Sequence, residues 1–252
     1  MSGWWKTFFD ETYAEIGLVT RQGQQADAFA DSVIRLLDLK PGERVFDQCC
    51  GIGRIAIPLA RRGMVLEGVD LAQSYVDAAA RTASQESLHA RFVCADGYSY
   101  VASAPCDAAI NVFTSFGYSD DDAQNEAMMR RAFESLRSGG RFLLERINPC
   151  WVVTFGLLPN ATRIPTGSGD DILAVEEPVA DWHRGTILSR WSIFFPDGRR
   201  DVRNFETRML FPNELVAMAK RVGFVDIALL SSVDGAAYDR HARRLLMTAR
   251  RA

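Results

Sequence analysis

VFDQCCGIGR, residues 45–54, is the stretch from which the fold of this chain can be worked out. An apolar strand here ends in an aspartate and two adjacent cysteines, and a Gly-x-Gly turn leads into the helical sequence RIAIPLARRG. Glycine at such a turn lets the backbone approach a ligand, and the start of the helix offers free N–H groups. The stretch is therefore a thiol site, a nucleotide-binding turn or an ordinary strand-to-helix connection.

The five cysteines do not favour a thiol or metal site. Cys49 and Cys50 are neighbours, and the others are scattered, so the chain contains no Cys-x-x-Cys pair of the kind that binds structural zinc. We interpret the pair as small buried residues under the turn, and no metal is expected. The odd number of cysteines, and a start without the features of a signal peptide, fit a cytoplasmic location.

Strand-like and helical segments alternate along residues 41–148. The helical segments include the Ala-rich AQSYVDAAARTASQES and DDDAQNEAMMRRAFESLRSGG, which is expected to end at its glycines. The strand-like segments are RVFDQCC, MVLEGVDL, ARFVCAD, CDAAINVF and RFLLERIN. Such alternation predicts an α/β fold with a Rossmann-like, doubly wound parallel sheet.

The pattern changes after residue 148. Residues 149–210 contain strand-like runs broken by the turn signals His-Arg-Gly and Pro-Asp-Gly, which predict antiparallel hairpins. Residues 211–252 return to a helix, FPNELVAMAKRVGF, followed by two closing strands. The core is therefore expected over 41–148 and 211–252, with an antiparallel β insertion before the last helix and a helical segment over 1–40.

The composition excludes two classes of partner. The chain has 252 residues and a net charge of −3, so it lacks the basic footprint of a nucleic-acid-binding protein. No apolar run approaches the roughly 18–20 residues that a membrane span needs. The sequence therefore predicts neither a nucleic-acid partner nor a membrane partner.

Three acids end successive strands of the core: Asp47, Asp70 and Asp96. GIGRIA fits the pattern of pyridine-dinucleotide enzymes, with Asp70 as the ribose-binding acid, but Asp47 would repel a pyrophosphate. Asp47 suits a positively charged ligand without phosphate, and S-adenosylmethionine is such a ligand. Asp70 would then accept hydrogen bonds from the ribose diol, and Asp96 would accept one from the adenine amino group. Helix or turn capping is the alternative role of Asp70 and Asp96.

On these motifs the sequence resembles the class I S-adenosylmethionine-dependent methyltransferases. It is most similar to bacterial small-molecule methyltransferases with an antiparallel substrate insertion, such as sugar and natural-product N-methyltransferases. The family's first motif usually has glycine where Cys49 stands, and the family uses the segment corresponding to 1–40 as a lid. The resemblance covers nearly the whole chain, through WWKTFFDETY, VFDQCCGIGR, EGVDLAQSY, FVCADG, CDAAINVFTSFGY, LRSGGRFLLERIN and FPNELVAMAKRVGF.

The resemblance also implies which residues form the site. Tyr13 in the lid and Ser115 after the fourth strand are the expected catalytic residues. The expected cofactor-binding residues are Asp47, Cys49, Gly51, Gly53, Asp70, Leu71, Asp96, Gly97, Asn111 and Phe113. The expected substrate-binding residues are Phe9, Thr114, Tyr118, Arg146, Asn148, His183 and Arg208. Core packing for the aromatic residues, and surface positions for the charged ones and for His183, are the competing interpretations.

The reaction expected from this resemblance is in-line displacement of the sulfonium methyl by an amine, or less readily a hydroxyl, of a small metabolite in a biosynthetic pathway such as antibiotic biosynthesis. Positioning and desolvation would supply most of the acceleration. The chain would act as a homodimer or beside a partner enzyme of its pathway. Two alternatives stay open: an enzyme of this fold that catalyses elimination or ring closure without methyl transfer, and a non-catalytic partner subunit.

Overall fold

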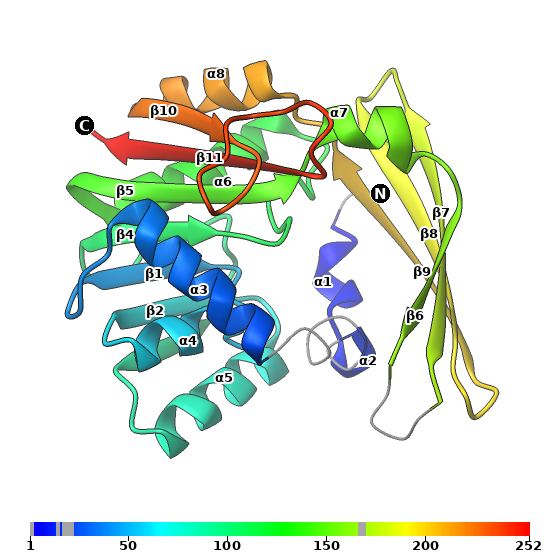
Figure 1. Ribbon diagram of the computed structural model, residues 1–252, viewed down its shortest axis with the longest axis horizontal. Coiled ribbons are helices and arrows are strands. Elements are labelled where there is room, and N and C mark those ends of the chain that lie inside the picture. The colour runs from blue at the N-terminus through cyan, green and yellow to red at the C-terminus, as the bar shows by residue number, and fades with distance from the viewer. Residues whose placement is uncertain (1–2, 14–15, 17–22, 166–169) are drawn as a thin grey trace.

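The structure is a computed structural model that describes residues 3–13, 16, 23–165 and 170–252. It contains a seven-stranded central sheet and a separate four-stranded antiparallel sheet, with two short N-terminal helices between them (Figure 1). Among the helices that the structure describes, none is long and apolar enough to cross a membrane.

The central sheet has the order β10-β11-β5-β4-β1-β2-β3. Its strands are β1 Arg44–Gln48, β2 Val65–Asp70, β3 Ala90–Cys94, β4 Cys106–Asn111, β5 Leu136–Ile147, β10 Phe224–Leu230 and β11 Arg244–Arg251. Strand β11 runs antiparallel to both of its neighbours, β10 and β5, and the other adjacent strands are paired in parallel. The order reverses between β1 and β4, and doubly wound sheets bind ligands at such a point, beyond the carboxyl ends of the strands. The predicted α/β, Rossmann-like fold is thus confirmed.

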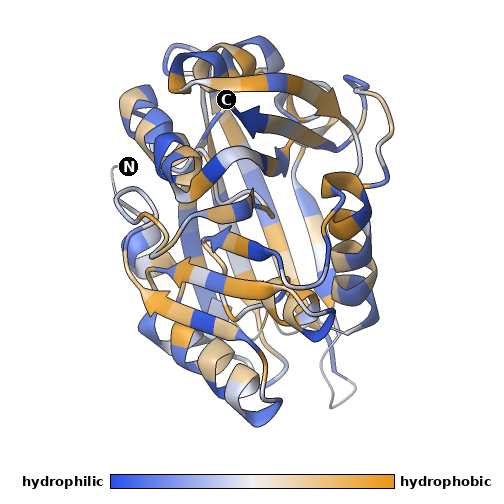
Figure 2. Ribbon diagram, turned by 90° about the vertical axis from the view of Figure 1, so that its left-hand side faces the viewer, coloured by the Kyte–Doolittle hydropathy of each residue, from blue (hydrophilic) through white to orange (hydrophobic). Residues whose placement is uncertain are grey.

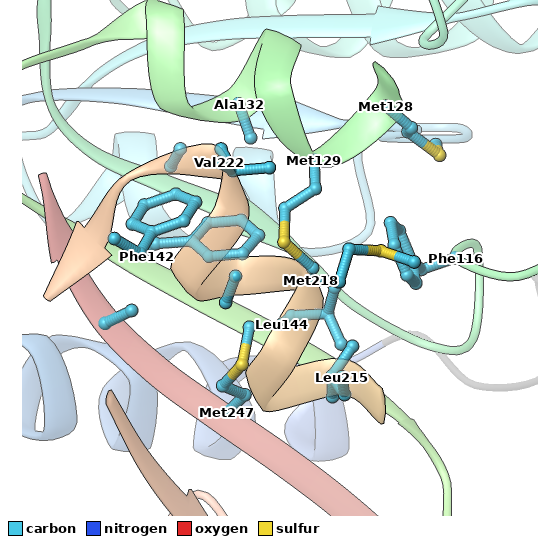
Figure 3. Packing of buried hydrophobic residues seen from close by; sticks show 14 of the residues in the cluster. Phe116, Met128, Met129, Ala132, Phe142, Leu144, Leu215, Met218, Val222 and Met247 are labelled. Carbon is cyan, nitrogen blue, oxygen red and sulfur yellow. The ribbon is translucent and has the colours of Figure 1, made fainter. Parts of the chain in front are cut away.

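Helices cover both faces of this sheet. Helices α3 Gln24–Leu37 and α4 Ala56–Arg61 bury their apolar sides on one face, and α6 Asp122–Ser135 and α8 Pro212–Val222 bury theirs on the other. Figure 3 shows the apolar cluster on the face covered by α6 and α8, in which Met128 and Met129 of α6 lie near Met218 of α8. Helix α5, Gln73–Gln85, packs on β2 and β3. The helices in Figure 2 show both hydrophobic and hydrophilic stretches, as expected of elements with one buried face.

Contacts at both ends of α8 explain why this helix begins and ends where the sequence predicts. Pro212 occupies the first turn, and the Glu214 carboxylate accepts a 2.8 Å hydrogen bond from the Phe211 N–H. Gly223 ends the helix at a φ of 114°, in the left-handed region that favours glycine.

Helix α6 ends earlier than the sequence predicted. It stops at Ser135, and Leu136 already belongs to β5, where it pairs with Cys106 of β4. The Arg251 guanidinium also donates a hydrogen bond to the Leu136 carbonyl. The two glycines expected to end the helix therefore lie within β5, after a register shift. Pairing with β4, which a single-sequence pattern does not show, overrides the helical propensity.

The predicted insertion forms the antiparallel sheet β6-β7-β8-β9. Its strands are β6 Asn160–Ile164, β7 Ile172–Asp181, β8 Thr186–Phe194 and β9 Arg200–Arg208, and they follow the short helix α7, Pro149–Trp151, and a π-helical turn, Val152–Gly156. The two predicted turn signals lie between strands β7, β8 and β9, with Gly185 and Gly198 at positive φ.

The N-terminal segment lies between the two sheets. Helices α1 Trp5–Phe8 and α2 Glu11–Tyr13 contact the insertion, whereas α3 packs on the central sheet (Figure 1). Within the predicted lid over 1–40, it is therefore α1 and α2 that stand above the carboxyl edge of the core. Residues 14–15 and 17–22 of that segment lie outside the described residues.

Candidate functional site

The glycine turn and the second strand end are joined through Asp70. Its Oδ2 accepts a 2.8 Å hydrogen bond from the Gly51 N–H, and its Oδ1 accepts a 3.0 Å bond from the Ala72 N–H. Burial raises the pKa of Asp70, and these backbone N–H groups oppose that rise. A carboxylate has about four lone-pair positions, so Asp70 keeps acceptor capacity for a ligand after both backbone bonds are made.

Asp47 is a buried acid with 2% exposure at the carboxyl end of β1. Burial raises its pKa to about 7, and the neighbouring Asp70 carboxylate adds to the rise. Arg54 and the Ala56 N–H at the start of α4 act in the opposite direction. A cationic ligand group beside Asp47 would favour the ionised carboxylate, whereas a phosphate would be repelled by it.

The two cysteines lie in the turn without reactive character. Cys49 adopts a φ of 65°, in the left-handed region, which explains why glycine would suit this position. Burial, followed by the carboxylates of Asp70 and Asp47, raises the pKa of the Cys49 thiol well above its usual value. Burial likewise raises the pKa of Cys50. Both thiols therefore stay protonated, contrary to what a thiol active site requires.

These residues border one cavity, which has about 1020 Å³ of empty space when its solvent mouth is included. We call it the acid-lined cavity. Trp5 of the lid and Tyr98 stand on its wall with ring centroids 5.5 Å apart. The predicted site residues on its wall are Phe9, Tyr13, Asp47, Cys49, Gly51, Asp70, Leu71, Asp96, Gly97, Phe113, Ser115 and Tyr118.

Two predicted cofactor-binding residues support the wall without lining it. The Asn111 amide donates a 3.1 Å hydrogen bond to Gln48, whose own amide donates to the Gly97 and Met128 carbonyls. Gly53 lies against α4 and α5, where an added Cβ would come within 3.0 Å of Ile57. Asn111 and Gly53 therefore hold the turn and the strand ends in place.

The loop after β4 is held in an unusual conformation. Phe113 and Thr114 have consecutive positive φ values of 64° and 65°. The Glu145 carboxylate accepts a 2.6 Å hydrogen bond from the Phe113 N–H and pairs with Arg244, which also donates to the Thr114 hydroxyl. Arg54 stacks on the Phe113 ring, with its guanidinium carbon 3.5 Å from the ring centroid. Strain of this kind persists only where surrounding contacts enforce it, and it gathers at functional sites.

A second cavity, with about 1630 Å³ of empty space including its mouth, is lined by residues of the lid, the antiparallel sheet and the core. We call it the aromatic cavity, because Trp4, Phe8, Trp151, Trp191 and Phe205 are on its wall. Four residues line both cavities: Phe9, Tyr13, Phe113 and Tyr118. Thr114 lines only the aromatic cavity and Ser115 only the acid-lined one.

The lid is bonded to the insertion and to the core through Asp10. The Arg203 guanidinium of β9 donates to both Asp10 carboxylate oxygens at 2.8 and 2.9 Å and to the Phe8 carbonyl at 2.8 Å. From the core side, the Tyr75 hydroxyl donates a 2.7 Å hydrogen bond to the Asp10 carbonyl. The lid therefore closes the space between the core and the insertion.

Four predicted substrate-binding residues line neither cavity in the described part of the structure. Arg146 is 1% exposed and donates to the Arg208 and Ile147 carbonyls. Burial, together with Arg208 and Arg244, lowers the pKa of Arg146 to about 10. From this buried position under the loop after β4, Arg146 is suited to supporting the loop and not to contacting a substrate.

The other three also make structural contacts. The Asn148 amide donates to the carbonyls of Asp239, Arg240 and Ala242, so it anchors the loop before β11. Arg208 pairs with Asp122 and Glu214 and joins the insertion to the core. His183 is exposed in the β7–β8 turn and shares a shallow hollow with Arg208.

Residues 45–140, which contain this turn and the strand ends around it, match the family described as "Methyltransferase domain". This stretch of the chain is similar to a methyltransferase domain. This match confirms the predicted resemblance to the S-adenosylmethionine-dependent methyltransferases, a class of enzymes whose cofactor is S-adenosylmethionine.

Solved methyltransferase structures share the fold over nearly the whole chain. An S-adenosylmethionine-dependent methyltransferase from Clostridium acetobutylicum ATCC 824 has a TM-score of 0.79 at 16% identity and 96% coverage of both chains. CalS10, an amino pentose methyltransferase from Micromonospora echinaspora, has a TM-score of 0.69 at 18% identity, covering 95% of this chain and 94% of that one. The sugar N-methyltransferase KedS8 from Streptoalloteichus sp ATCC 53650 has a TM-score of 0.69 at 17% identity, covering 95% and 91%.

Curated relatives match over shorter stretches of the chain. A 23S rRNA (uracil(1939)-C(5))-methyltransferase from Aromatoleum aromaticum is 43% identical over 58 residues, which are 23% of this chain and 13% of that protein. An S-adenosyl-L-methionine-dependent Diels-Alderase from Talaromyces variabilis is 29% identical over 116 residues, which are 44% of this chain and 38% of that protein. The chain thus spans a small part of the first relative's length and well under half of the second's.

The residues of the acid-lined cavity fit S-adenosylmethionine by their chemistry. Asp47, Asp70 and Asp96 supply carboxylate oxygens for a ligand that carries an ammonium, a sulfonium and a ribose diol. The Trp5 and Tyr98 rings offer flat apolar surface suited to an adenine. No group of three or more His, Cys, Asp or Glu side chains suited to a metal ion occurs among the described residues.

Several residues of the candidate site were not identified from the sequence. Tyr98 directly follows the Asp96-Gly97 pair, so its position next to a predicted contact was a usable signal. Glu145, Arg244 and Glu176 come from three different strands. Nothing in their local sequence distinguishes them from surface charges, and only the fold brings them to the aromatic cavity or its supporting loop.

Proposed function

We propose that this chain transfers the methyl group of S-adenosylmethionine to an amine of a small metabolite in a biosynthetic pathway. The observation that carries the proposal is the pair of adjoining cavities, one lined by acids and one by aromatic rings. They share the wall formed by Phe9, Tyr13, Phe113 and Tyr118. A cofactor in the first and an acceptor in the second would meet at these four residues.

In the acid-lined cavity, Asp70 would hold the ribose diol, and Asp47 would lie near the methionine ammonium. Asp96, with the rings of Trp5 and Tyr98, would bind the adenine. When bound, S-adenosylmethionine supplies an activated methyl group on its sulfonium. The residues of the chain bind and orient that group and exclude water from it.

In the aromatic cavity, the residues position the acceptor. Phe9 and Tyr118 stack with centroids 5.7 Å apart and an interplanar angle of 27°, which joins the lid to the loop after β4. Such a wall excludes water and holds the acceptor for in-line attack. The Tyr13 hydroxyl, on the same wall, is the proposed donor that orients it.

The residues of the shared wall favour an amine acceptor over a hydroxyl acceptor. A hydroxyl acceptor has to lose its proton to a base during attack, whereas a neutral amine already has a free lone pair. Burial raises the pKa of the Tyr118 phenol well above its usual value, so Tyr118 stays protonated and cannot act as that base. CalS10 and KedS8, which share the fold, are described as an amino pentose methyltransferase and a sugar N-methyltransferase, in agreement with an amine acceptor.

Ring formation without methyl transfer is a second candidate function. The likeness to the Diels-Alderase covers 44% of this chain, and an aromatic cavity would also suit a folded apolar substrate. Whichever reaction applies, we propose a cytoplasmic enzyme that acts on a small molecule, alone, as a homodimer or with a partner of its pathway. Size-exclusion chromatography distinguishes these assemblies.

A mass-spectrometric screen tests the proposed function. The purified chain is incubated with cell-extract metabolites and S-adenosylmethionine carrying an isotopically labelled methyl group. Methyl transfer predicts products heavier by one labelled methyl, with fragmentation that places the label on nitrogen. A substrate that is consumed while its product carries no label would favour ring closure or elimination instead.

A further inference from the structure

Glu176 of β7 is the only acidic residue among the described residues that line the aromatic cavity. Its carboxylate is half-buried and accepts a 2.8 Å hydrogen bond from the Ser189 hydroxyl of β8. Ser189 itself is 2% exposed. The carboxylate is therefore held in place on the wall of the cavity, where the adjacent strand supplies one of its hydrogen bonds.

The surroundings of Glu176 carry no compensating charge. Among the described residues, none forms an ion pair with its carboxylate within 4.0 Å. Of the two cations on the cavity wall, Arg244 is already bonded to Glu145, and Arg243 stands over the Trp151 ring. A half-buried carboxylate without a cationic partner on a cavity wall can pair with a ligand that brings the positive charge.

Aromatic rings complete the surroundings of this carboxylate. Trp191 of β8 is the residue opposite Glu176 in the strand register, and its ring makes an edge contact with Phe205 at 5.2 Å. Trp191 also stacks on Tyr13, which lines both cavities. An ammonium ion is attracted both by a carboxylate and by the faces of such rings.

We propose that Glu176 binds a positively charged amino group of the acceptor, distinct from the neutral amine that receives the methyl group. The acceptor class is an organic cation with an apolar or aromatic body, selected over neutral and anionic molecules of the same shape. The inference rests on the proposed function only in treating the aromatic cavity as the acceptor site. It adds a specificity-determining residue and a charge requirement that an amine acceptor by itself does not imply.

The test compares three probes of one shape and different charge: benzylamine, benzyl alcohol and benzoate. Their dissociation constants are measured by ligand-observed NMR on the full chain, for the wild type, Glu176→Gln and Glu177→Gln. Glu177 is the matched control, because successive strand residues face opposite sides of a sheet and Glu177 is exposed and outside the cavity. Thermal melting verifies that each variant is folded.

The wild type should bind benzylamine about tenfold or more tightly than benzyl alcohol, the scale of a hydrogen bond to a charged group. Benzoate should bind most weakly. Glu176→Gln should remove the preference for benzylamine, and Glu177→Gln should keep it. The proposal is overturned if benzylamine does not bind, binds like benzyl alcohol, or keeps its advantage in folded Glu176→Gln.

Failure of this inference and failure of the proposed function give different results. If only the inference fails, the probes show no charge preference dependent on Glu176, while labelled methyl transfer persists. If only the proposed function fails, the preference for benzylamine persists, while no product gains the labelled methyl.

Discussion

The Tyr13 ring stacks on the indole of Trp191, with ring centroids 6.3 Å apart and an interplanar angle of 22°. Tyr13 belongs to the lid and Trp191 to the insertion, so this contact joins two segments that are far apart in the sequence. Because Tyr13 also lines both cavities, the insertion sets the position of the residue at the boundary between them. Packing in the insertion is therefore coupled to the proposed reaction.

Tyr13→Phe tests the role of the hydroxyl at that boundary. The variant keeps the ring and its contact with Trp191, so folding should be almost unchanged. Loss of one orienting hydrogen bond should slow turnover by roughly tenfold or more, since about 1.4 kcal/mol corresponds to a factor of ten in rate. Affinity for S-adenosylhomocysteine, measured by calorimetry, should change much less.

Tyr100→Phe is the control for Tyr13→Phe, because the Tyr100 hydroxyl bonds Glu67 and Tyr100 lines neither cavity. The turnover rate of Tyr100→Phe should equal that of the wild type when the two proteins are compared at equal stability. Turnover of Tyr13→Phe equal to that of the wild type would reduce the lid to a hydrophobic cover.

Arg203→Met tests whether the lid depends on its bonds to the insertion. Arg203 is 10% exposed in its side chain and holds both carboxylate oxygens of Asp10. Without it, we expect the acceptor KM to rise and S-adenosylhomocysteine affinity to fall by about 1–2 kcal/mol, since hydrogen bonds to charged groups are on this scale. Arg199→Met, at an exposed position paired with Asp197, should change neither quantity. Equal behaviour of the two variants would show that closure does not need Arg203.

Asp70→Asn tests the proposed ribose contact. Both carboxylate oxygens already accept backbone N–H groups, so an amide would turn a donor toward one of them and also serve the diol less well. We expect S-adenosylmethionine affinity to fall by about 1.5–3 kcal/mol, roughly 10- to 150-fold. Asp77→Asn, the same change at an exposed position on α5, should bind normally. Unchanged calorimetric affinity in folded Asp70→Asn would rule out the contact.

Asp47→Asn tests the pH dependence of stability. The pKa of Asp47 is raised from its usual 3.8 to about 7 in the folded protein, so the neutral carboxyl is the form that folding favours. Its contribution to stability is fully present below the unfolded-state pKa and is lost as the pH rises through about 7. The variant has no ionisable group at position 47. Without ligand, its melting temperature should therefore rise relative to that of the wild type between about pH 5 and 8. A constant difference over that range would contradict the assignment.

Much of the core could be predicted from the sequence because its signals are local. The short strand-like runs, the glycines at Gly51 and Gly53 and the strand-end acids are each visible within a few residues. The same positions were predicted as cofactor contacts, and Asp47, Asp70 and Asp96 do line one cavity. Gly53 and Asn111, also predicted as cofactor contacts, support that cavity from outside, because Gly53 lies against α4 and α5 and the Asn111 side chain is directed to Gln48.

The acceptor side could not be predicted in the same way. Its wall is assembled from the lid, the loop after β4 and all four insertion strands, so its residues depend on long-range packing. Arg146 and Arg208 looked like anion-binding residues because arginine is common at such sites, but here they bond carbonyls and core acids. Glu176 had no local signal, since its significance comes from Ser189 and Trp191 on the next strand.

Isothermal titration of the wild type with S-adenosylmethionine and, separately, with NAD⁺ tests the central claim most directly. The two ligands correspond to the two interpretations of the glycine turn, and they differ in the charge that they would place near the buried Asp47. We expect saturable one-to-one binding of S-adenosylmethionine to the wild type and no measurable binding of NAD⁺. Binding of NAD⁺ with no binding of S-adenosylmethionine would contradict the central claim.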